Sequence, residues 1–248
     1  MKVIGVIPAR YASSRFPGKP LVDIQGKSMI ARVYQRCQAA KTLDRVIVAT
    51  DDERIYKHVK SFGGEVQMTS DEHRSGTDRC AEVATSIPDA ELVVNIQGDE
   101  PFIDPGQIDQ LIHLFAQNQQ IDIATLAKKI DDQAALIDPN IVKVVFDKNE
   151  QALYFSRSTI PFVRNLAAGQ WLRHHDFYKH IGIYAFKKEV LLACAKLAPG
   201  RLEQIESLEQ LRWLEAGYNI QIGLTKLETV GIDTPDDLKK FQSNNELL

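Results

Sequence analysis

The chain of 248 residues has few cysteines and no long apolar run. Its three cysteines, Cys37, Cys80 and Cys194, form no C-x-x-C pair. An odd number at such wide spacing argues against a disulfide framework and favours small buried thiols in a reducing compartment. No run of 18 apolar residues occurs, and the apolar stretch that ends at Pro8 is too short for a signal peptide. We therefore expect a cytoplasmic protein.

An excess of charge of either sign is also missing. The formal net charge is −3, with 25% charged and 44% hydrophobic residues. This balance gives no general attraction to nucleic acid or to an anionic membrane, so we expect neither as a partner. The histidines form no H-x-x-x-H or H-E-x-x-H motif, which argues against a histidine-based zinc site.

What the sequence does contain is an alternation of strand-like and helical segments. The apolar runs of the first half are separated by amphipathic or capped segments, such as the helix expected from Ser28 to about Ala40. This rhythm predicts an α/β fold with a doubly wound, mostly parallel sheet flanked by helices. The strands expected in this half are Val3–Ile7, Arg45–Ala49, Glu65–Met68 and Leu92–Ile96.

The second half is less regular. Residues 160–177 contain proline, glycine and many polar residues, which predicts a mobile or lobe-forming loop. A helix is expected at Ser207–Glu215, and Thr234-Pro235 is typical of a helix start. With no clear linker, we expect one domain over residues 1–248, with a small inserted lobe at about 150–185. The further strands expected here are Ile123–Lys128, Val142–Phe146, Gln151–Tyr154, Ile181–Phe186 and Ile220–Leu224.

The first strand runs into a loop with cationic side chains. Arg10, Arg15 and Lys19 follow Pro8, at the carboxyl end of a strand, where open α/β sheets bind ligands. Three cations there predict an anionic ligand, most simply a polyphosphate. The loop has neither the G-x-G-x-x-G nor the G-x-x-x-x-G-K-[ST] signature, but Ser13 can donate to phosphate oxygens.

A carboxylate follows a second apolar strand. The run 93–101 reads Val-Val-Asn-Ile-Gln-Gly-Asp-Glu-Pro, so that Asp99 stands just past a strand end. Mg²⁺ is held by one or two carboxylates and completes its octahedron with water and phosphate oxygens. With the cationic loop on a neighbouring strand, a magnesium site becomes the favoured interpretation of Asp99.

The opening loop resembles a known family. The segment I-P-A-R-Y-A-S-S-R-F-P-G-K-P-L is similar to the N-terminal signature of the sugar nucleotidyltransferases. More narrowly, it resembles the cytidylyltransferases that activate 3-deoxy-D-manno-octulosonate (Kdo), and the resemblance runs from about Lys2 to about Leu238. It implies cytidylyl transfer from CTP to Kdo, an acidic eight-carbon sugar, giving CMP-Kdo and diphosphate for lipopolysaccharide synthesis.

The resemblance also assigns roles on the nucleotide side. Arg10 and Lys19 would hold the β- and γ-phosphates, and Mg²⁺ on Asp99 and Asp233 would bridge the α-phosphate and the attacking hydroxyl. We expect no side chain to act as general base. Residues near the cytosine, ribose and phosphates would be Pro8, Ala9, Arg10, Ser13, Arg15, Lys19, Arg74, Ser75, Gly76 and Arg79.

Polar residues of the second half are candidates for the sugar. Alternation along the strand places His180, Gly182 and Tyr184 on one face, which suits a polyhydroxylated ligand. Arg157 and Arg164 could hold the sugar carboxylate, because the forked guanidinium matches its two oxygens. The resemblance adds Gln97, Glu209 and Gln210 as sugar contacts. The sugar-binding candidates are Gln97, Arg157, Arg164, His180, Tyr184, Glu209 and Gln210.

Several alternatives remain open on the sequence alone. The sugar can be a related acid, such as 8-amino-Kdo or a sialic acid, and residues 195–203 differ from the segment common in the family. A glycosyltransferase would carry Asp-x-Asp where this chain has Gly-Asp-Glu-Pro. The missing glycine fingerprint argues against an NAD-linked oxidoreductase, and the many charges at strand ends argue against a non-catalytic binding module. The resemblance implies a homodimer, and it makes the lobe at about 150–185 a sugar-binding and dimerisation lobe. Ile160–Phe162 and Trp171 are candidate interface residues.

Overall fold

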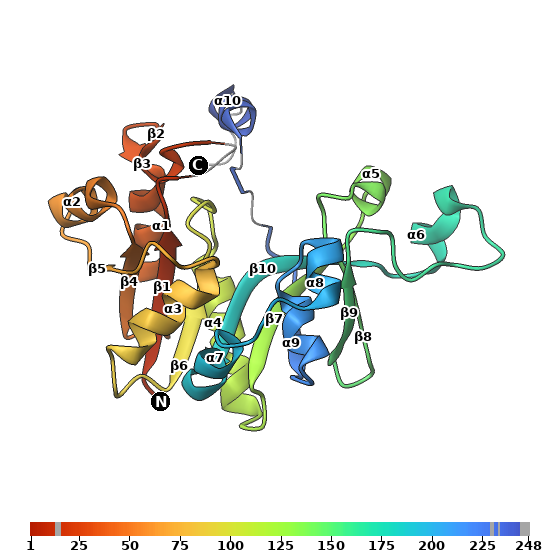
Figure 1. The fold of residues 1–248 in the computed structure, drawn as a ribbon. Helices are drawn as coiled ribbons and strands as arrows, with labels where there is room; N and C mark the ends of the chain where they lie inside the picture. The colour runs from red at the N-terminus through yellow and green to blue at the C-terminus, as the bar shows by residue number, and fades with distance from the viewer. Residues whose placement is uncertain (13–15, 229–230, 233, 244–248) are drawn as a thin grey trace. The chain divides into compact units, whose positions relative to one another are not determined.

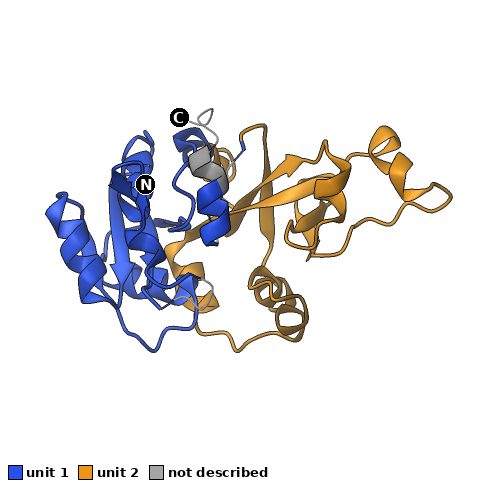
Figure 2. Cartoon of the chain, turned by 90° about the horizontal axis from the view of Figure 1, so that it is seen from above, with its two compact units in different colours: residues 1–109, 228–248 blue, residues 110–227 orange. Residues whose placement is uncertain are grey.

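The computed structural model describes residues 1–12, 16–228, 231–232 and 234–243, and the chain divides into two compact units (Figure 2). Unit 1 comprises Met1–Asp109 and Glu228–Leu248, and unit 2 comprises Gln110–Leu227. Residues 150–185, where we expected a small lobe, all belong to unit 2. That lobe's roles in sugar binding and dimerisation stay predictions.

Unit 1 is built on a parallel sheet in the order β6-β1-β4-β5 (Figure 1). The chain first winds outward from β1 through β4 to β5 and then returns to the other side of β1 for β6. Because such crossovers are right-handed, the reversal puts α3 on the opposite face of the sheet from α1 and α2. The doubly wound parallel arrangement is confirmed in this unit. Its elements are β1 (Val3–Ala9), η1 (Lys19–Leu21), β2 (Asp23–Ile24), β3 (Lys27–Ser28), α1 (Met29–Gln38), β4 (Arg45–Thr50), α2 (Glu53–Ser61), β5 (Val66–Met68), α3 (Gly76–Thr85), β6 (Leu92–Asn95) and α10 (Pro235–Ser243).

Side-chain caps determine where the helices of unit 1 begin. Ser28 Oγ accepts the amide of Ala31, and Asp52 accepts the amide of Arg54 at the start of α2. Thr234 accepts the amide of Asp237, whose carboxylate accepts the amide of Thr234 in return. These caps satisfy amides that would lack partners in the first turn. The expected helix starts at Ser28 and Thr234 are thus confirmed.

Unit 2 has a mixed sheet around β7 (Ile123–Lys129), which pairs parallel with β11 (Ile220–Thr225) and antiparallel with β10 (Tyr178–Lys187). β8 (Lys143–Phe146) pairs antiparallel with β10 and with β9 (Ala152–Ser156). The turn between β8 and β9 is short, and two strands joined this way can only run antiparallel. The helical elements are α5 (Gln133–Ile137), η2 (Ala168–Gln170), α6 (Trp171–His174), α7 (Lys188–Cys194), α8 (Arg201–Glu206) and α9 (Gln210–Glu215). Helix α4 (Pro105–Gln117), which contains the boundary between the units, was not among the expected elements.

The helix expected at Ser207–Glu215 is shorter than predicted. Ser207 has a φ of 52°, in the left-handed region, and it ends α8 before α9 begins at Gln210. A left-handed residue cannot continue a right-handed helix. The apolar spacing of this segment continues across the break, so periodicity alone did not reveal it.

Burial agrees with the sequence for the cysteines and differs from it at Trp171. Cys37, Cys80 and Cys194 are buried free thiols, as expected, and burial raises the pKa of Cys194 to about 12. Trp171, expected at an interface, is only 7% exposed and packs with Phe177 in the core of unit 2, whereas Phe162 is 76% exposed. In the part of the chain that the structure describes, no helix has the length and apolar character needed to cross a bilayer.

Candidate active site

A pocket in unit 1 lies where the winding of the sheet reverses. It is lined by residues that follow β1, by residues that follow β6 and by the segment that leads into α3. This is the topological switch point of the sheet, at the carboxyl ends of the strands. The pocket has a volume of about 290 Å³ and is lined by Pro8, Ala9, Arg10, Lys19, Pro20, His73, Arg74, Ser75, Gly76, Arg79, Gln97, Gly98 and Asp99. Most of the expected nucleotide-binding residues therefore meet in one cavity.

Two glycines allow the pocket walls to meet at Pro8. A Cβ added at Gly98 would lie 2.8 Å from the carbonyl oxygen of Pro8, and one added at Gly76 would lie 3.0 Å from its Cγ. The first distance is shorter than a carbon atom can approach an oxygen, and the second is tighter than an ordinary carbon–carbon contact. The lack of a side chain at positions 76 and 98 therefore lets these segments lie close together.

Opposite charges meet inside the pocket. Lys19 Nζ donates to Asp99 Oδ2 at 2.7 Å, and their side chains are only 13% and 32% exposed. Lys19 is the first residue of η1, which Gly18 precedes with a φ of 73°. Arg10 is exposed at the same pocket. The expected phosphate-binding cations and the expected metal-binding carboxylate are thus within reach of one ligand.

The segment that leads into α3 is held by a capping box. Ser75 Oγ accepts the amide of Asp78, and the Asp78 carboxylate accepts the amides of Ser75 and Arg74. This arrangement fixes the backbone of Arg74, Ser75 and Gly76 where it lines the pocket. Because the first turn of a helix has a partial positive charge, the site also favours an anion.

Arg79 has a structural role that the sequence did not indicate. Its guanidinium is 4% exposed and donates to the Asp51 carboxylate at 2.7 Å, to Thr69 Oγ1 at 2.7 Å and to the carbonyl of Ser70 at 3.0 Å. It thereby joins α3 to the segments that follow β4 and β5. Arg79 lines the pocket, but these bonds occupy its guanidinium, so its expected nucleotide contact stays a prediction.

Sequence reasoning missed His73, which also lines the pocket. Its Nε2 lies 2.5 Å from a carboxylate oxygen of Glu82, nine residues further along the chain. Glu82 in turn accepts the amide of Ser70. Burial alone would raise the pKa of Glu82, but the hydrogen bonds from Ser70 and His73 and the nearby charges of His73 and Arg79 together bring it below its usual value. The only signal in the sequence was the position of His73 next to Arg74-Ser75-Gly76.

Three of the expected site residues lie outside the described part of the chain. They are Ser13 and Arg15 of the opening loop and Asp233, the second expected metal ligand. Their roles stay predictions.

In unit 2, His180 and Tyr184 share one face of β10, as predicted. Their ring centroids are 5.2 Å apart, although the pairing of β10 with β7 shifts register between Ile181 and Tyr184. Thr125 Oγ1 lies 2.7 Å from the carbonyl oxygen of Ile183 and 2.9 Å from His180 Nε2. A hydroxyl that donates to a carbonyl must accept from the histidine, so His180 carries its proton on Nε2. Burial lowers the pKa of His180 to about 3.

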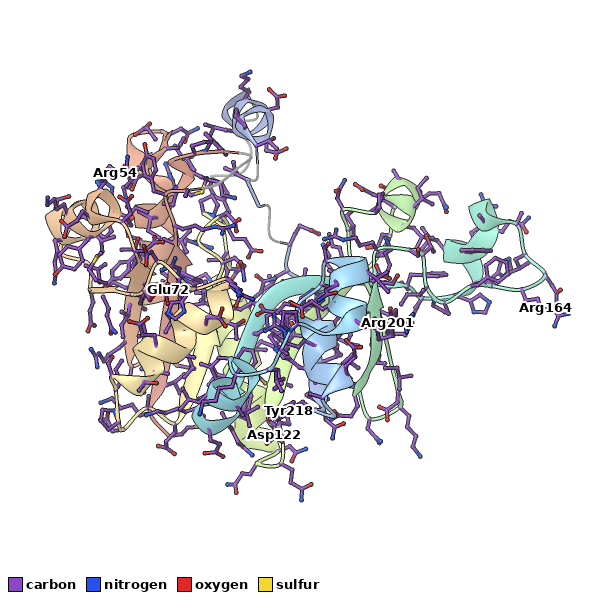
Figure 3. All side chains as sticks on the ribbon, viewed as in Figure 1. Arg54, Glu72, Asp122, Arg164, Arg201 and Tyr218 are labelled. Atoms are coloured by element: carbon purple, nitrogen blue, oxygen red, sulfur yellow. The ribbon has the colours of Figure 1, made fainter. Side chains whose placement is uncertain are left out.

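The two arginines expected to hold a carboxylate differ from each other. Arg157 donates from Nε to the carbonyl of Glu206 at 2.7 Å and from Nη1 to the carbonyl of Pro139 at 3.1 Å. It thus links the end of β9 to α8, and backbone carbonyl oxygens occupy its guanidinium. Arg164 is exposed in the loop before α6 (Figure 3).

Gln210 and Glu209 stand at the start of α9. Gln210 is only 5% exposed and is buried together with Leu211 and Trp213. Helix α9 begins at Gln210, after the break at Ser207. Their expected contacts with sugar hydroxyls stay predictions, as does that of Gln97, which lines the pocket of unit 1.

Comparison with known proteins identifies the family. The family model described as cytidylyltransferase matches residues 4–222. The chain belongs to the cytidylyltransferase family. It is 55% identical over 245 residues to a 3-deoxy-manno-octulosonate cytidylyltransferase of Parabacteroides distasonis, covering 97% of this chain and 96% of that protein. The enzyme of the same name from Bacteroides thetaiotaomicron is 55% identical over 243 residues, with 96% of both chains covered.

A solved structure supports the same assignment for this cytidylyltransferase. A CMP:2-keto-3-deoxy-manno-octonic acid synthetase in complex with CTP superposes with a TM-score of 0.91 at 43% identity, covering 98% of each chain. The resemblance inferred from the opening loop is therefore confirmed over nearly the whole chain, as is the fold class. An oxidoreductase and a non-catalytic binding module are no longer supported.

Proposed function

We propose that this cytidylyltransferase transfers the cytidylyl group of CTP to 3-deoxy-manno-octulosonate. The anomeric hydroxyl of the sugar attacks the α-phosphorus in line, an O–P bond forms, and the bond to the leaving diphosphate breaks. The hydroxyl proton is released to solvent. Catalysis of this kind depends mainly on positioning and on neutralising charge.

The observation that carries this proposal is the pocket at the switch point of unit 1. It brings Arg10, Lys19 and Asp99 together with the capped backbone at 74–76. Lys19 and Arg10 would neutralise the β- and γ-phosphates, so that the diphosphate can leave. Backbone groups at Pro8 and Ala9 and around Gly76 would recognise the base and the ribose.

The residues of the pocket also fit Mg²⁺, which we propose as the cofactor. In the described residues no group of three or more His, Cys, Asp or Glu side chains gathers as a complete cage. Mg²⁺ needs no such cage, because one or two carboxylates suffice when phosphate oxygens and water complete its octahedron. Asp99 would hold it, joined by Asp233. When bound, the ion supplies positive charge to the phosphates and to the attacking oxygen.

The choice of Kdo is supported by two relatives that are 55% identical to this chain and are named 3-deoxy-manno-octulosonate cytidylyltransferase. Diphosphate release tests it directly, with CTP, UTP and ATP each offered Kdo, 8-amino-Kdo or a sialic acid, with and without Mg²⁺. We expect turnover with CTP and Kdo that is lost when Mg²⁺ is chelated. Preference for another sugar would overturn the substrate assignment and leave the family intact.

A homodimer, a cytoplasmic location and a role in lipopolysaccharide synthesis are further parts of the proposal. The family resemblance supports all three, and Phe162, which is 76% exposed in unit 2, is a candidate contact residue of the dimer. Sedimentation over a range of concentrations tests the dimer, and Phe162→Ser should weaken it. A monomer at all concentrations would rule it out.

A further inference from the structure

Tyr11 packs against the residue that precedes Lys19. Its carbonyl oxygen accepts the amide of Gly18 at 2.9 Å, which closes the loop between them. A Cβ at Gly18 would lie 3.1–3.2 Å from three atoms of the Tyr11 ring side chain, so the ring lies directly on the glycine. Gly18 is the N-cap of η1, and Lys19 is the first residue of that turn. The position of the ring therefore determines the backbone from which Lys19 extends.

The same ring is covered by a cation from α2. The Arg54 guanidinium carbon lies 3.3 Å from the centroid of the Tyr11 ring. Figure 3 shows Arg54 at the start of this helix. A guanidinium stacks on an aromatic face through its flat, weakly hydrated surface. The Arg54–Tyr11 pair thus joins α2 to the opening loop, beside the packing of α2 against η1.

Asp52 fixes the orientation of that guanidinium. Its two carboxylate oxygens accept from Arg54 Nε at 2.9 Å and from Nη2 at 2.6 Å, and the first also accepts the amide of Arg54. A forked pair of this kind sets the plane of the guanidinium as well as its position. Elsewhere on the same helix, Lys57 and Glu53 form an ordinary exposed pair at 3.2 Å, with no aromatic partner.

We propose that Arg54, acting through Tyr11 and Gly18, is a positioning residue that holds Lys19 for the phosphates of CTP. Arg54 itself lines no part of the pocket described above. The inference rests on the proposed role of Lys19 in CTP binding. It predicts that the β4–α2 junction contributes to nucleotide affinity from outside the nucleotide pocket.

The experiment compares Arg54→Ala and Arg54→Lys with Lys57→Ala, the control on the same helix. KM for CTP, KM for Kdo, kcat and the unfolding temperature are measured for each. For Arg54→Ala we expect KM for CTP to rise about fivefold, the factor that about 1 kcal/mol produces. KM for Kdo and the unfolding temperature should stay close to the wild type. KM for CTP in Arg54→Lys should lie between those of the wild type and Arg54→Ala, because lysine keeps the positive charge but has no flat guanidinium to stack on Tyr11. Lys57→Ala should change none of these values.

A double-mutant cycle shows whether the effect passes through Lys19. If Arg54 acts by placing Lys19, then Arg54→Ala adds no further loss of CTP affinity in a Lys19→Ala background. Tyr11→Leu should reproduce the effect of Arg54→Ala, and Tyr11→Phe, which keeps the ring, should recover most of the affinity. If the wild type is active, two results would overturn this inference alone. One is an unchanged CTP affinity in Arg54→Ala, and the other is fully additive losses of CTP affinity in the cycle. A wild type without CTP-dependent turnover would instead overturn the proposed function.

Discussion

Lys19 Nζ and Asp99 Oδ2 lie 2.7 Å apart, although the two residues are separated by 80 positions in the chain. Each neutralises the other in a pocket where both are largely shielded from solvent. The bond uses one of the three donors of the Lys19 ammonium and one of the two oxygens of Asp99. Lys19 could therefore hold a phosphate, and Asp99 a cation, while the two side chains remain close.

Lys19→Ala should weaken CTP binding much more than CMP binding. A charge-assisted hydrogen bond contributes about 1.5–3 kcal/mol, which corresponds to roughly 10- to 100-fold in affinity. CMP has no β- or γ-phosphate and should lose far less. Calorimetric titration of both nucleotides measures the difference. Equal losses for CTP and CMP would remove Lys19 from the terminal phosphates.

Asp99→Asn should reduce kcat by at least about 100-fold while part of the nucleotide affinity remains. The amide keeps the shape of the side chain but has no charge to hold a cation where charge develops on the phosphate. Diphosphate release at saturating Mg²⁺ is the measurement, with the exposed Asp71→Asn as control. Near-normal turnover in Asp99→Asn would exclude the metal assignment.

Arg79→Met should act mainly on stability. Removing the guanidinium leaves the Asp51 carboxylate without its charged partner, and breaking a buried pair in this way costs about 3 kcal/mol. Urea unfolding followed by circular dichroism gives the free energy of unfolding. If stability is unchanged and CTP affinity falls, Arg79 is instead a nucleotide contact, as the sequence suggested.

Gly98→Ala should disturb the pocket and lower stability by about 1–3 kcal/mol. The new methyl group would lie 2.8 Å from the backbone oxygen of Pro8, so one of the two loops must move. Gly169→Ala is the control, because nothing lies within 4 Å of the corresponding position there. A Gly98→Ala protein with wild-type stability and CTP affinity would show that the two loops can separate without cost.

His180 should make the protein less stable as the pH falls. Its folded pKa of about 3 lies below the usual value of about 6.5, so the unfolded chain takes up a proton that the folded protein does not. The stabilisation is complete above about pH 6.5 and is lost as the pH falls toward 3. Between pH 7 and pH 5 this contributes roughly 2 kcal/mol. His180→Gln, which still offers Thr125 a donor, should lack this contribution in unfolding curves at the two pH values; identical pH dependence would contradict it.

The sequence was most informative where the determinants of structure are local. Buried strands such as Val3–Ala9 are continuous apolar runs, and caps such as Ser28 act within three residues of themselves. The break at Ser207 was missed because a left-handed residue between two short helices does not interrupt the apolar spacing. Trp171 was misplaced for a similar reason, since an aromatic residue in a polar loop can pack either inward or outward.

Residues that are neighbours in the chain were enough to predict that Arg10 and Lys19 follow one apolar strand and that Asp99 follows another. Which of these side chains meet depends on the fold. Lys19 pairs with Asp99, while Arg79 and Arg157 are occupied by a carboxylate and by backbone carbonyls. Partners so far apart in the chain depend on strand order and on close backbone approach at glycines, and neither leaves a local pattern in the sequence.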